Sequence, residues 1–372
     1  MIKIGLITIH ATDNYGAVLQ AFATQQTLEK YGEVKIINYN TPYVLKTMCV
    51  IRTGSTFRHL LRMAKDLFRF FSRIKAINKF SEFILYKLHL TRVISSHEDF
   101  SKLENEFDVF FSGSDQIWRP GIVSEKTEFE PAYFLDFVKN KIKISYGSST
   151  GGYEFSKEEE RVVANYLKSY DYVSVRELDT SEKMTHLLGV SVKHVLDPTL
   201  LLTRDVWLKS LKIDTDNKQG DYILVYALKK DLLMRSTVKL ISRRLNLKII
   251  AIDQDPFLGF NTHKHIKDAG PEEFVELFSN ACFVVTSSFH GVAFSLNFNI
   301  PFVAIKPVVG SNRIKSLLGA VGLLDRYVDD MESAELIDYS QRDIFHAANS
   351  KLEHLRGESI NFIKISLTRL LN

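Results

Sequence analysis

Short apolar runs alternate with amphipathic segments along most of the chain. Residues 2–9 form a near-continuous apolar run, and residues 17–30 then carry apolar side chains at helical spacing. The same alternation continues to about residue 200 and resumes from residue 222 to residue 321. Apolar runs of about four to eight residues are typical of strands buried on both faces of a parallel sheet. The pattern therefore predicts an α/β protein.

Local signals mark where several of these elements begin. Asp13 or Asn14 can cap the first helix, and Ser156 with Glu159 forms a Ser-x-x-Glu capping box. Pro271 suits the first position of another helix. The expected strands are residues 2–9, 34–39, 107–111, 142–146, 172–175, 192–196, 222–227, 248–252, 282–285 and 301–305. The expected helices are residues 17–30, 156–167, 180–188, 231–246, 271–280, 292–297, 314–321 and 351–371.

A polar stretch at residues 203–221 interrupts this alternation. A chain of 372 residues is also long enough for two domains of ordinary size. We expect an N-terminal α/β domain at residues 1–205 and a C-terminal α/β domain at residues 206–350. A C-terminal helix at residues 351–372 can pack back across the junction between these two domains.

Residues 46–92 form a basic helical insert in the first of these domains. They contain eleven Lys and Arg against two acidic residues, a net charge of 11 − 2 = +9, whereas the whole chain carries +4. Their apolar residues recur at helical spacing, which leaves two interpretations open. Residues 55–80 can lie on an anionic membrane surface, or the apolar stripe can pack on a core with the charges in water. The stripe consists of Phe57, Leu60, Leu61, Ala64, Leu67, Phe68, Phe71 and Ile74.

The composition and the cysteine positions limit the cellular compartments and partners that we expect for this protein. The two cysteines, Cys49 and Cys282, lie far apart and show no metal-ligand spacing, which fits a reducing compartment without disulfides. The first residues read directly as a strand rather than a signal peptide, and no apolar run is long enough to span a membrane. We expect a cytoplasmic protein, with contact to the inner membrane face as an option. We expect no metal and no nucleic acid partner.

The segment 286–291 carries the clearest candidate chemistry. Ser287 and Ser288 follow a predicted strand, and His290 lies in the turn before the next helix. Ligands collect above the carboxyl ends of parallel strands, and the backbone N–H groups of a helix N-terminus suit an anion. The segment therefore predicts an anion-binding turn. A capped helix with a surface histidine is the alternative.

Polar loops follow three other predicted elements. The loop 10–16 contains Gly16, which allows something to approach closely, and the loop 112–118 contains Asp115. Arg176 ends a strand, and Arg313 precedes the helix at 314–321. The planar fork of an arginine matches a carboxylate or a phosphate. Alternatively, these residues are an ordinary capped turn, a turn aspartate, a surface ion pair and a solvated helix-start charge.

Five segments together resemble the polysaccharide pyruvyl transferase family, from the first strand to about Leu324. Members of this family have two-domain folds of the glycosyltransferase-B type, with the active site in a cleft that the two domains face. They transfer the enolpyruvyl group of phosphoenolpyruvate to a sugar. Many have an arginine where this chain has Ser288. The segments are Asp13-Asn-Tyr-Gly-Ala-Val-Leu-Gln20, Ser112-Gly-Ser-Asp-Gln-Ile-Trp118, Ser174-Val-Arg-Glu177, Leu196-Asp-Pro-Thr199 and Thr286-Ser-Ser-Phe-His-Gly291.

The resemblance implies that Arg176, His290 and Arg313 bind the donor. Two arginines from opposite domains would then share one small anion, with the hydroxyls of Ser287 and Ser288 holding phosphate oxygens. We expect His290 to act as the acid and Asp115 as the base, although which group takes which role stays open. No cofactor is needed beyond the donor substrate. The expected acceptor-binding residues are Asn14, Tyr15, Gly16, Asp115 and Trp118.

The expected reaction is pyruvyl ketal formation on a sugar of a bacterial surface polysaccharide precursor, such as a capsule precursor, carried on a polyprenyl lipid. A nucleotide-sugar-dependent glycosyltransferase of the same architecture is the first alternative. A non-catalytic scaffold on the membrane surface, which would use residues 55–80, is the second.

Overall fold

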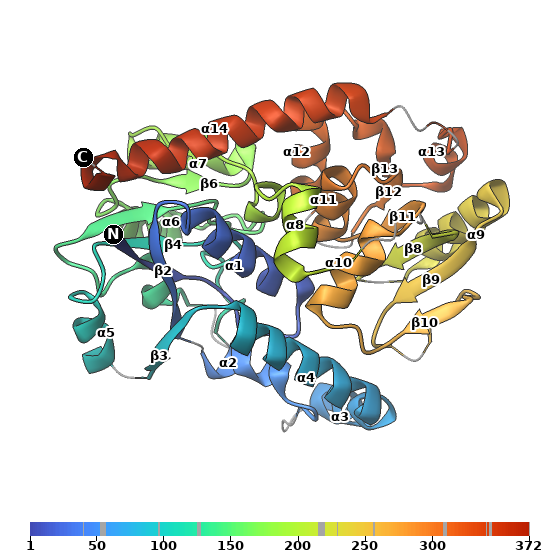
Figure 1. The fold of residues 1–372 in the computed structure, drawn as a ribbon, viewed down its shortest axis with the longest axis horizontal. Coiled ribbons are helices and arrows are strands. Elements are labelled where there is room, and N and C mark those ends of the chain that lie inside the picture. Colours follow the sequence, from blue (N-terminus) through green and yellow to red (C-terminus); the bar gives the residue numbers. More distant parts are fainter. Residues whose placement is uncertain are drawn as a thin grey trace. The chain divides into compact units, whose positions relative to one another are not determined.

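The computed structural model consists of two compact α/β units. It describes residues 1–39, 41–52, 57–95, 97–124, 128–214, 220–228, 230–255, 257–307, 311–339, 341 and 344–371. Unit 1 comprises residues 1–48, 81–201 and 354–372, and unit 2 comprises residues 49–80 and 202–353. Each unit is built on a parallel sheet (Figure 1), which confirms the predicted fold class.

The sheet of unit 1 has the strand order β3-β2-β1-β4-β5, and all its strand pairs are parallel. β6 and β7 form a parallel pair of their own. Single bridges from Ile144 to Tyr172 and from Ser148 to Val175 connect this pair to β5 and the loop after it. The strands are β1 (Ile2–Ile7), β2 (Gly32–Tyr39), β3 (Leu90–Ile94), β4 (Val109–Ser112), β5 (Ile142–Ser145), β6 (Ser174–Val175) and β7 (Lys193–His194).

The central strands of unit 1 are buried, as their continuous apolar runs predict. All four residues of β4 are buried. In the loop after β1, Asn14 caps α1, and its side chain accepts hydrogen bonds from Gly16 N and Ala17 N. The Ser156 capping box is also present. The helices of unit 1 are α1 (Tyr15–Leu28), α2 (Pro42–Leu45), α5 (His97–Leu103), α6 (Lys157–Leu167), α7 (Leu178–Leu188) and the later parts of α4 and α14.

The sheet of unit 2 has the order β10-β9-β8-β11-β12-β13 and is also parallel throughout. Its strands are β8 (Tyr222–Tyr226), β9 (Lys248–Ile252), β10 (Lys264–Ile266), β11 (Phe283–Thr286), β12 (Phe302–Ile305) and β13 (Tyr327–Val328). Its helices are α3 (Phe57–Phe68), α8 (Arg204–Leu211), α9 (Leu232–Leu245), α10 (Pro271–Ser279), α11 (Phe289–Asn297), α12 (Ser311–Val321), α13 (Met331–Leu336) and the earlier parts of α4 (Phe70–Lys87) and α14 (Phe345–Leu371).

The units differ from the expected domains in two respects. Residues 49–80 of the basic insert belong to unit 2 rather than to the N-terminal domain. The polar stretch expected at the junction begins with α8, whose Trp207 is fully buried against Phe294, and the division falls after Leu201. Residues 354–372 of the C-terminal helix belong to unit 1. Among the described residues, no helix combines the length and apolarity needed to cross a bilayer.

Candidate functional site

Each sheet contains one place where the strand order reverses. In unit 1 this switch point lies between β1 and β4, and in unit 2 it lies between β8 and β11. Loops that leave neighbouring strands in opposite directions open a crevice at such a point, which is where open α/β sheets bind ligands. The predicted loops 10–16 and 112–118 follow β1 and β4, and the predicted turn 286–291 follows β11. The topology therefore brings these sequence-predicted segments to the two switch points.

Buried hydrogen bonds hold the two loops of the unit 1 switch point together. The Thr8 hydroxyl donates to the Ser114 carbonyl over 2.9 Å, and the Gln20 amide donates to the Thr8 hydroxyl over 2.9 Å. Asn14 uses its side-chain oxygen to cap α1. The capped turn considered from the sequence is thus present, and an acceptor contact by Asn14, Tyr15 or Gly16 stays a prediction.

Asp115 stands in an unusual backbone conformation at this switch point. Its φ of 75° lies in the left-handed region, and the residue pairs with Ser148 in a single parallel bridge. Residues with a side chain other than Asn or Asp rarely adopt such a φ. Its side chain is 12% exposed. The fold therefore holds a carboxylate at the switch point with limited access to solvent.

Arg176 is the centre of a buried charge cluster. Its guanidinium lies 2.7 Å from Asp197, 3.3 Å from Glu177 and 3.4 Å from Asp115, and its side chain is 1% exposed. Burial alone would lower the pKa of Arg176, but the charges of Asp197, Glu177 and Asp115 outweigh burial and raise that pKa above its usual value. Glu177 in turn accepts a hydrogen bond from Ser149. We call Arg176, Asp115, Glu177 and Asp197 the unit 1 charge cluster.

This cluster changes the interpretation of Arg176. One positive and three negative side chains leave the cluster with a net charge of about −2, which disfavours a bound anion. Arg176 is therefore not a surface ion pair, and a direct contact of Arg176 with the donor stays a prediction. Its geometry is that of a positioning residue for Asp115. Reasoning from the sequence missed Glu177 and Asp197 as members of the site, although both lie in segments that carry the family resemblance.

Trp118 packs against an aromatic side chain of unit 1. Its side chain is fully buried and stacks on Phe134, with ring centroids 5.6 Å apart and an angle of 10° between the planes. Large aromatic side chains of this kind contribute mainly to core packing. Trp118 is thus part of the core of unit 1, and an acceptor contact by Trp118 stays a prediction.

His10 is a further buried polar residue after β1 that the sequence analysis did not select. Its Nδ1 donates to the Thr8 carbonyl over 3.0 Å, and its Nε2 lies 3.4 Å from the Asn38 side-chain oxygen. Burial lowers the pKa of His10 more than these hydrogen bonds raise it. In the sequence, the position of His10 just after the end of a predicted strand is the only sign that it belongs near the site.

Hydrogen bonds also join the two loops of the unit 2 switch point. The Thr286 hydroxyl donates to the Tyr226 carbonyl over 2.6 Å, and the backbone N–H of Leu228 donates to the Ser287 hydroxyl over 3.2 Å. The backbone N–H of Ser288 donates to Thr286. Ser288 is the N-cap of α11, yet its side chain makes no capping hydrogen bond to the described backbone. The Ser288 hydroxyl therefore does not act as a helix cap, which is the role that the alternative interpretation of this segment gives it.

His290 and Arg313 both contact one aromatic ring in unit 2. α11 begins at Phe289, so His290 lies in the first helical turn rather than in the loop that the sequence suggested. The His290 and Phe289 ring centroids are 5.3 Å apart, and the Arg313 guanidinium carbon lies 5.9 Å from the Phe289 centroid. These contacts bring an imidazole and a guanidinium to the N-terminal end of α11, where the helix dipole also favours an anion.

Gly291 allows α11 to approach β11 closely. A Cβ atom at this position would lie 2.1 Å from the Thr286 hydroxyl oxygen. The distance leaves no room for any other residue unless the helix moves. The glycine in this turn therefore sets the position of His290.

Unit 2 contains a charge cluster of its own, in the loops that follow β8 and β9. Lys230 pairs with Asp253 and lies 3.2 Å from Asp255, and Asp255 also pairs with Lys65 and Arg69 of the basic insert. The hydrogen bonds of Lys65 and Lys230 and their charges lower the pKa of Asp255, although burial, the largest single influence, acts in the opposite direction. These groups neutralise one another within unit 2.

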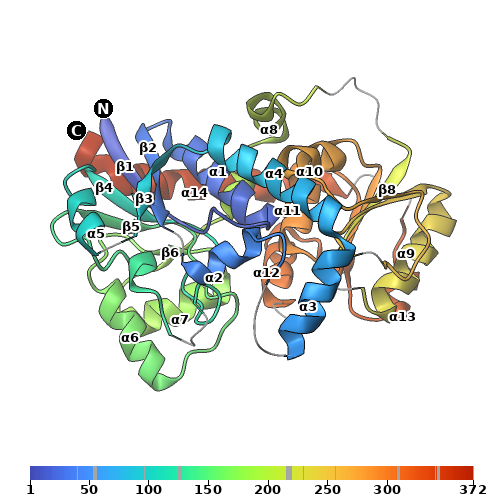
Figure 2. The same cartoon turned by 90° about the horizontal axis from the view of Figure 1, so that it is seen from below.

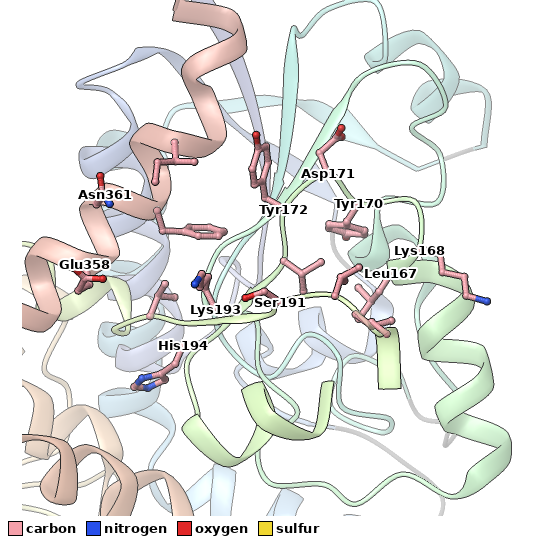
Figure 3. A pocket seen from close by; sticks show the side chains of 16 residues that line it. Leu167, Lys168, Tyr170, Asp171, Tyr172, Ser191, Lys193, His194, Glu358 and Asn361 are labelled. Atoms are coloured by element: carbon pink, nitrogen blue, oxygen red, sulfur yellow. The ribbon is translucent and has the colours of Figure 1, made fainter. Parts of the chain in front are cut away.

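A cavity of about 510 Å³ lies in unit 1. Figure 3 shows Glu358 and Asn361 of α14 on one side of it and Tyr170, Asp171 and Tyr172 on the other. His194 also lines it, and burial, which outweighs a hydrogen bond to the Arg176 backbone, lowers the pKa of His194. The cavity contains none of the sequence-predicted site residues. We therefore place the candidate site at the switch points, where topology and polar loops coincide. The described residues contain no cluster of His, Cys, Asp and Glu suited to a metal ion.

One known protein family matches most of this chain. A family described as polysaccharide pyruvyl transferase matches residues 14–307. The chain belongs to the polysaccharide pyruvyl transferase family. The match includes both loops of the unit 1 switch point from Asn14 onwards and the turn 286–291 of unit 2. It ends before Arg313. No curated protein matches the sequence significantly.

Solved structures share the architecture of this pyruvyl transferase family member. Neisseria meningitidis UDP-GlcNAc 2-epimerase bound to UDP-GlcNAc is 10% identical, with a TM-score of 0.56 over 99% of this chain and 100% of that one. Staphylococcus aureus MnaA in complex with UDP is 13% identical, with a TM-score of 0.53 over 99% of this chain and 97% of that one. At this identity the likeness concerns the fold alone, which is of the glycosyltransferase-B type.

Proposed function

We propose that this pyruvyl transferase moves the enolpyruvyl group of phosphoenolpyruvate onto a sugar and closes a cyclic ketal there. The observation that carries the proposal is that His290 and Arg313 both contact the Phe289 ring, at the N-terminus of α11. Phosphoenolpyruvate has a carboxylate and a phosphate, and both need cations and N–H donors. A guanidinium, an imidazole and a helix N-terminus are groups of this kind.

The proposed reaction divides the proton transfers between two groups. An acid, for which His290 is our candidate, protonates the methylene carbon of the enol and makes the adjacent carbon electrophilic. A sugar hydroxyl adds to that carbon and gives its proton to a base, for which Asp115 is our candidate. A second hydroxyl then adds to the same carbon while the bond to the phosphate oxygen breaks. Its proton leaves with the phosphate, so the products are a ketal with a methyl and a carboxylate group, and inorganic phosphate.

Each unit would contribute a different part of this chemistry. In unit 2, Arg313, Ser287 and Ser288 would hold the donor anion together with His290. In unit 1, the charge cluster would position Asp115, with Arg176 acting through that carboxylate. Because the three carboxylates of the cluster outnumber its one guanidinium, we assign the donor to the unit 2 groups. The acceptor is proposed to be a sugar of a surface polysaccharide precursor that is carried on a polyprenyl lipid.

The likeness to epimerase and MnaA structures that hold UDP-GlcNAc or UDP supports a second candidate function, a nucleotide-sugar-dependent transferase. Such an enzyme uses a carboxylate to bind the ribose hydroxyls. Residues 286–313 contain no Asp or Glu. This absence favours phosphoenolpyruvate as the donor.

The test is incubation of the purified protein with model glycosides and either phosphoenolpyruvate or UDP-sugars. We expect phosphate release and a glycoside heavier by the mass of one pyruvyl ketal with phosphoenolpyruvate alone. D115N keeps a residue that tolerates positive φ and removes the charge, so it should lose the activity without loss of fold. Glycosyl transfer from a UDP-sugar, with no reaction from phosphoenolpyruvate, would refute the proposal in favour of the second function.

A further inference from the structure

The first helix of the basic insert shows an apolar face to solvent. We define the outer face as Leu60, Leu61, Leu67, Phe68 and Phe71, which come from α3 and the first turn of α4. These side chains are between 56% and 85% exposed, with Phe68 at 85% and Phe71 at 81%. Single exposed apolar residues are ordinary, but a stripe of five at helical spacing marks an interaction surface. Figure 2 shows α3 (blue) as a helix outside the sheet of unit 2.

The opposite, inward side of the same segment is charged. Asp66 has a side chain with no exposure, while Arg69 is 9% exposed and Arg73 is 1% exposed. In a globular protein the apolar stripe of a surface helix normally faces the core and the charges face water. This segment has the reverse orientation. Of the two interpretations that the sequence left open, the described side chains therefore exclude the one in which the whole stripe packs on a core.

Specific pairs fix the segment in this orientation. Asp66 pairs with Arg52 at 2.8 Å and with Arg69 at 2.7 Å. Burial alone would raise the pKa of Asp66, but the hydrogen bonds from these two arginines outweigh it and hold that pKa well below its usual value. Arg73 donates to Gln254 and to the backbone carbonyl of Cys49.

These pairs explain why the stripe faces outward. If the segment rotated to bury its outer face, Asp66 and Arg73 would lose their partners. Breaking buried charge pairs is strongly unfavourable.

The charges around the outer face indicate what it contacts. Residues 46–92 carry a net charge of +9, of which a part is neutralised within unit 2. Arg62 and Lys75 are exposed and make no ion pair with any described residue. Exposed apolar side chains on a segment that also carries free cations complement a surface that combines acyl chains with anionic headgroups. Residues 55 and 56 of the predicted 55–80 contact lie outside the described residues.

We propose that the outer face docks this protein on an anionic lipid bilayer, with α3 lying in the headgroup plane and Phe68 and Phe71 entering the acyl boundary. The inference does not rest on the proposed reaction, because lipid binding needs no turnover. It goes beyond the proposed reaction because it assigns the protein a location, the surface of an anionic membrane.

The test is sedimentation of the full-length protein with vesicles of phosphatidylglycerol and phosphatidylcholine. We expect binding at low salt that weakens as salt is added, and weaker binding to phosphatidylcholine alone. F68S/F71S should lower the partition coefficient at least about tenfold, because burial of one such side chain alone is worth an order of magnitude or more. R62E/K75E should lower binding to the anionic vesicles only.

A matched control removes comparable exposed apolar surface elsewhere in unit 2. Leu232 is 79% exposed and Leu336 is 81% exposed, so L232S/L336S should bind vesicles as the unmodified protein does. F71W gives a second readout, since Trp118 and Trp207 are fully buried. Its emission should shift to shorter wavelength with anionic vesicles.

Two outcomes would overturn the proposal. One is equal sedimentation of F68S/F71S and the unmodified protein. The other is absence of vesicle binding at low salt together with concentration-dependent self-association that F68S/F71S abolishes. The second outcome would assign the outer face to contact between copies of the chain. Circular dichroism of each variant establishes that a loss of binding is not a loss of fold.

Discussion

The Arg176 guanidinium lies 2.7 Å from the Asp197 carboxylate, and both side chains are almost completely inaccessible to solvent. The same guanidinium reaches Asp115, the candidate base. A buried pair of this kind need not add net stability, but removal of one partner leaves an uncompensated charge. Arg176 variants can therefore distinguish two roles for this residue, a direct ligand of the donor and a positioning residue for Asp115.

R176A should lower the free energy of unfolding by about 3–5 kcal/mol, because the buried carboxylate of Asp197 would lose the positive charge 2.7 Å away. Urea denaturation followed by circular dichroism measures this. K183A breaks the exposed pair of Lys183 with Glu154 and should leave the denaturation midpoint unchanged. R176K keeps the charge but loses the fork, so we expect an intermediate stability. An R176K protein with unchanged stability and a raised KM for phosphoenolpyruvate alone would instead make Arg176 a donor ligand.

H290A should lower kcat by about 100-fold or more while the fold stays intact, as is usual when a proton-transfer group is removed. His290 is in the first turn of α11 next to the Phe289 ring, so the substitution truncates the side chain at the proposed donor site. Phosphate release from phosphoenolpyruvate is the measurement. H354A, at an exposed position of α14, is the matched control. Full activity of H290A would remove His290 from the reaction.

G291A should destabilise the protein by about 1–3 kcal/mol, because the new methyl group would overlap the Thr286 hydroxyl unless α11 moves. It should also reduce activity, since the same movement displaces His290. G357A is a control with the opposite sign. Gly357 is inside α14, and a Cβ there meets no described atom within 4 Å, so alanine should stabilise the helix by roughly 0.8–1.0 kcal/mol. Thermal unfolding of both variants compares the two effects directly.

Stability should fall as the pH is lowered from 7 to 5, in part because of His10. Burial lowers the pKa of His10 in the folded protein, whereas an unfolded chain has a histidine pKa of about 6.5. The unfolded state therefore binds more protons in this range. Unfolding becomes easier as the pH drops below the unfolded value.

H10Q should remove a share of that pH dependence, and the exposed H354Q should not. The measurement is the free energy of unfolding from urea titrations at a series of pH values. His194 and His265 also have pKa values that burial lowers, so part of the slope should persist in H10Q. An identical slope in H10Q and the unmodified protein would contradict this account.

The sequence was sufficient to predict the sheet strands of the candidate site. The runs that became β1, β4, β8 and β11 are continuous and apolar because a strand covered on both faces needs apolar residues at every position. Local capping chemistry predicted the Ser156 box correctly and limited the cap of α1 to Asp13 or Asn14, of which the structure shows Asn14. Short edge elements such as β10 and β13 escaped prediction, because two or three residues carry no detectable period.

The sequence by itself thus determined the α/β class, the family and the loops that hold the candidate chemistry, since each depends on residues close together along the chain. The tertiary structure alone decided which partners Arg176 has, that Trp118 belongs to the core and that the outer face of α3 is exposed. Asp197 is 21 residues from Arg176, and Asp255 is 186 residues from Arg69. An amphipathic period shows that a helix has two faces, but only the packing of distant charges shows which face turns inward.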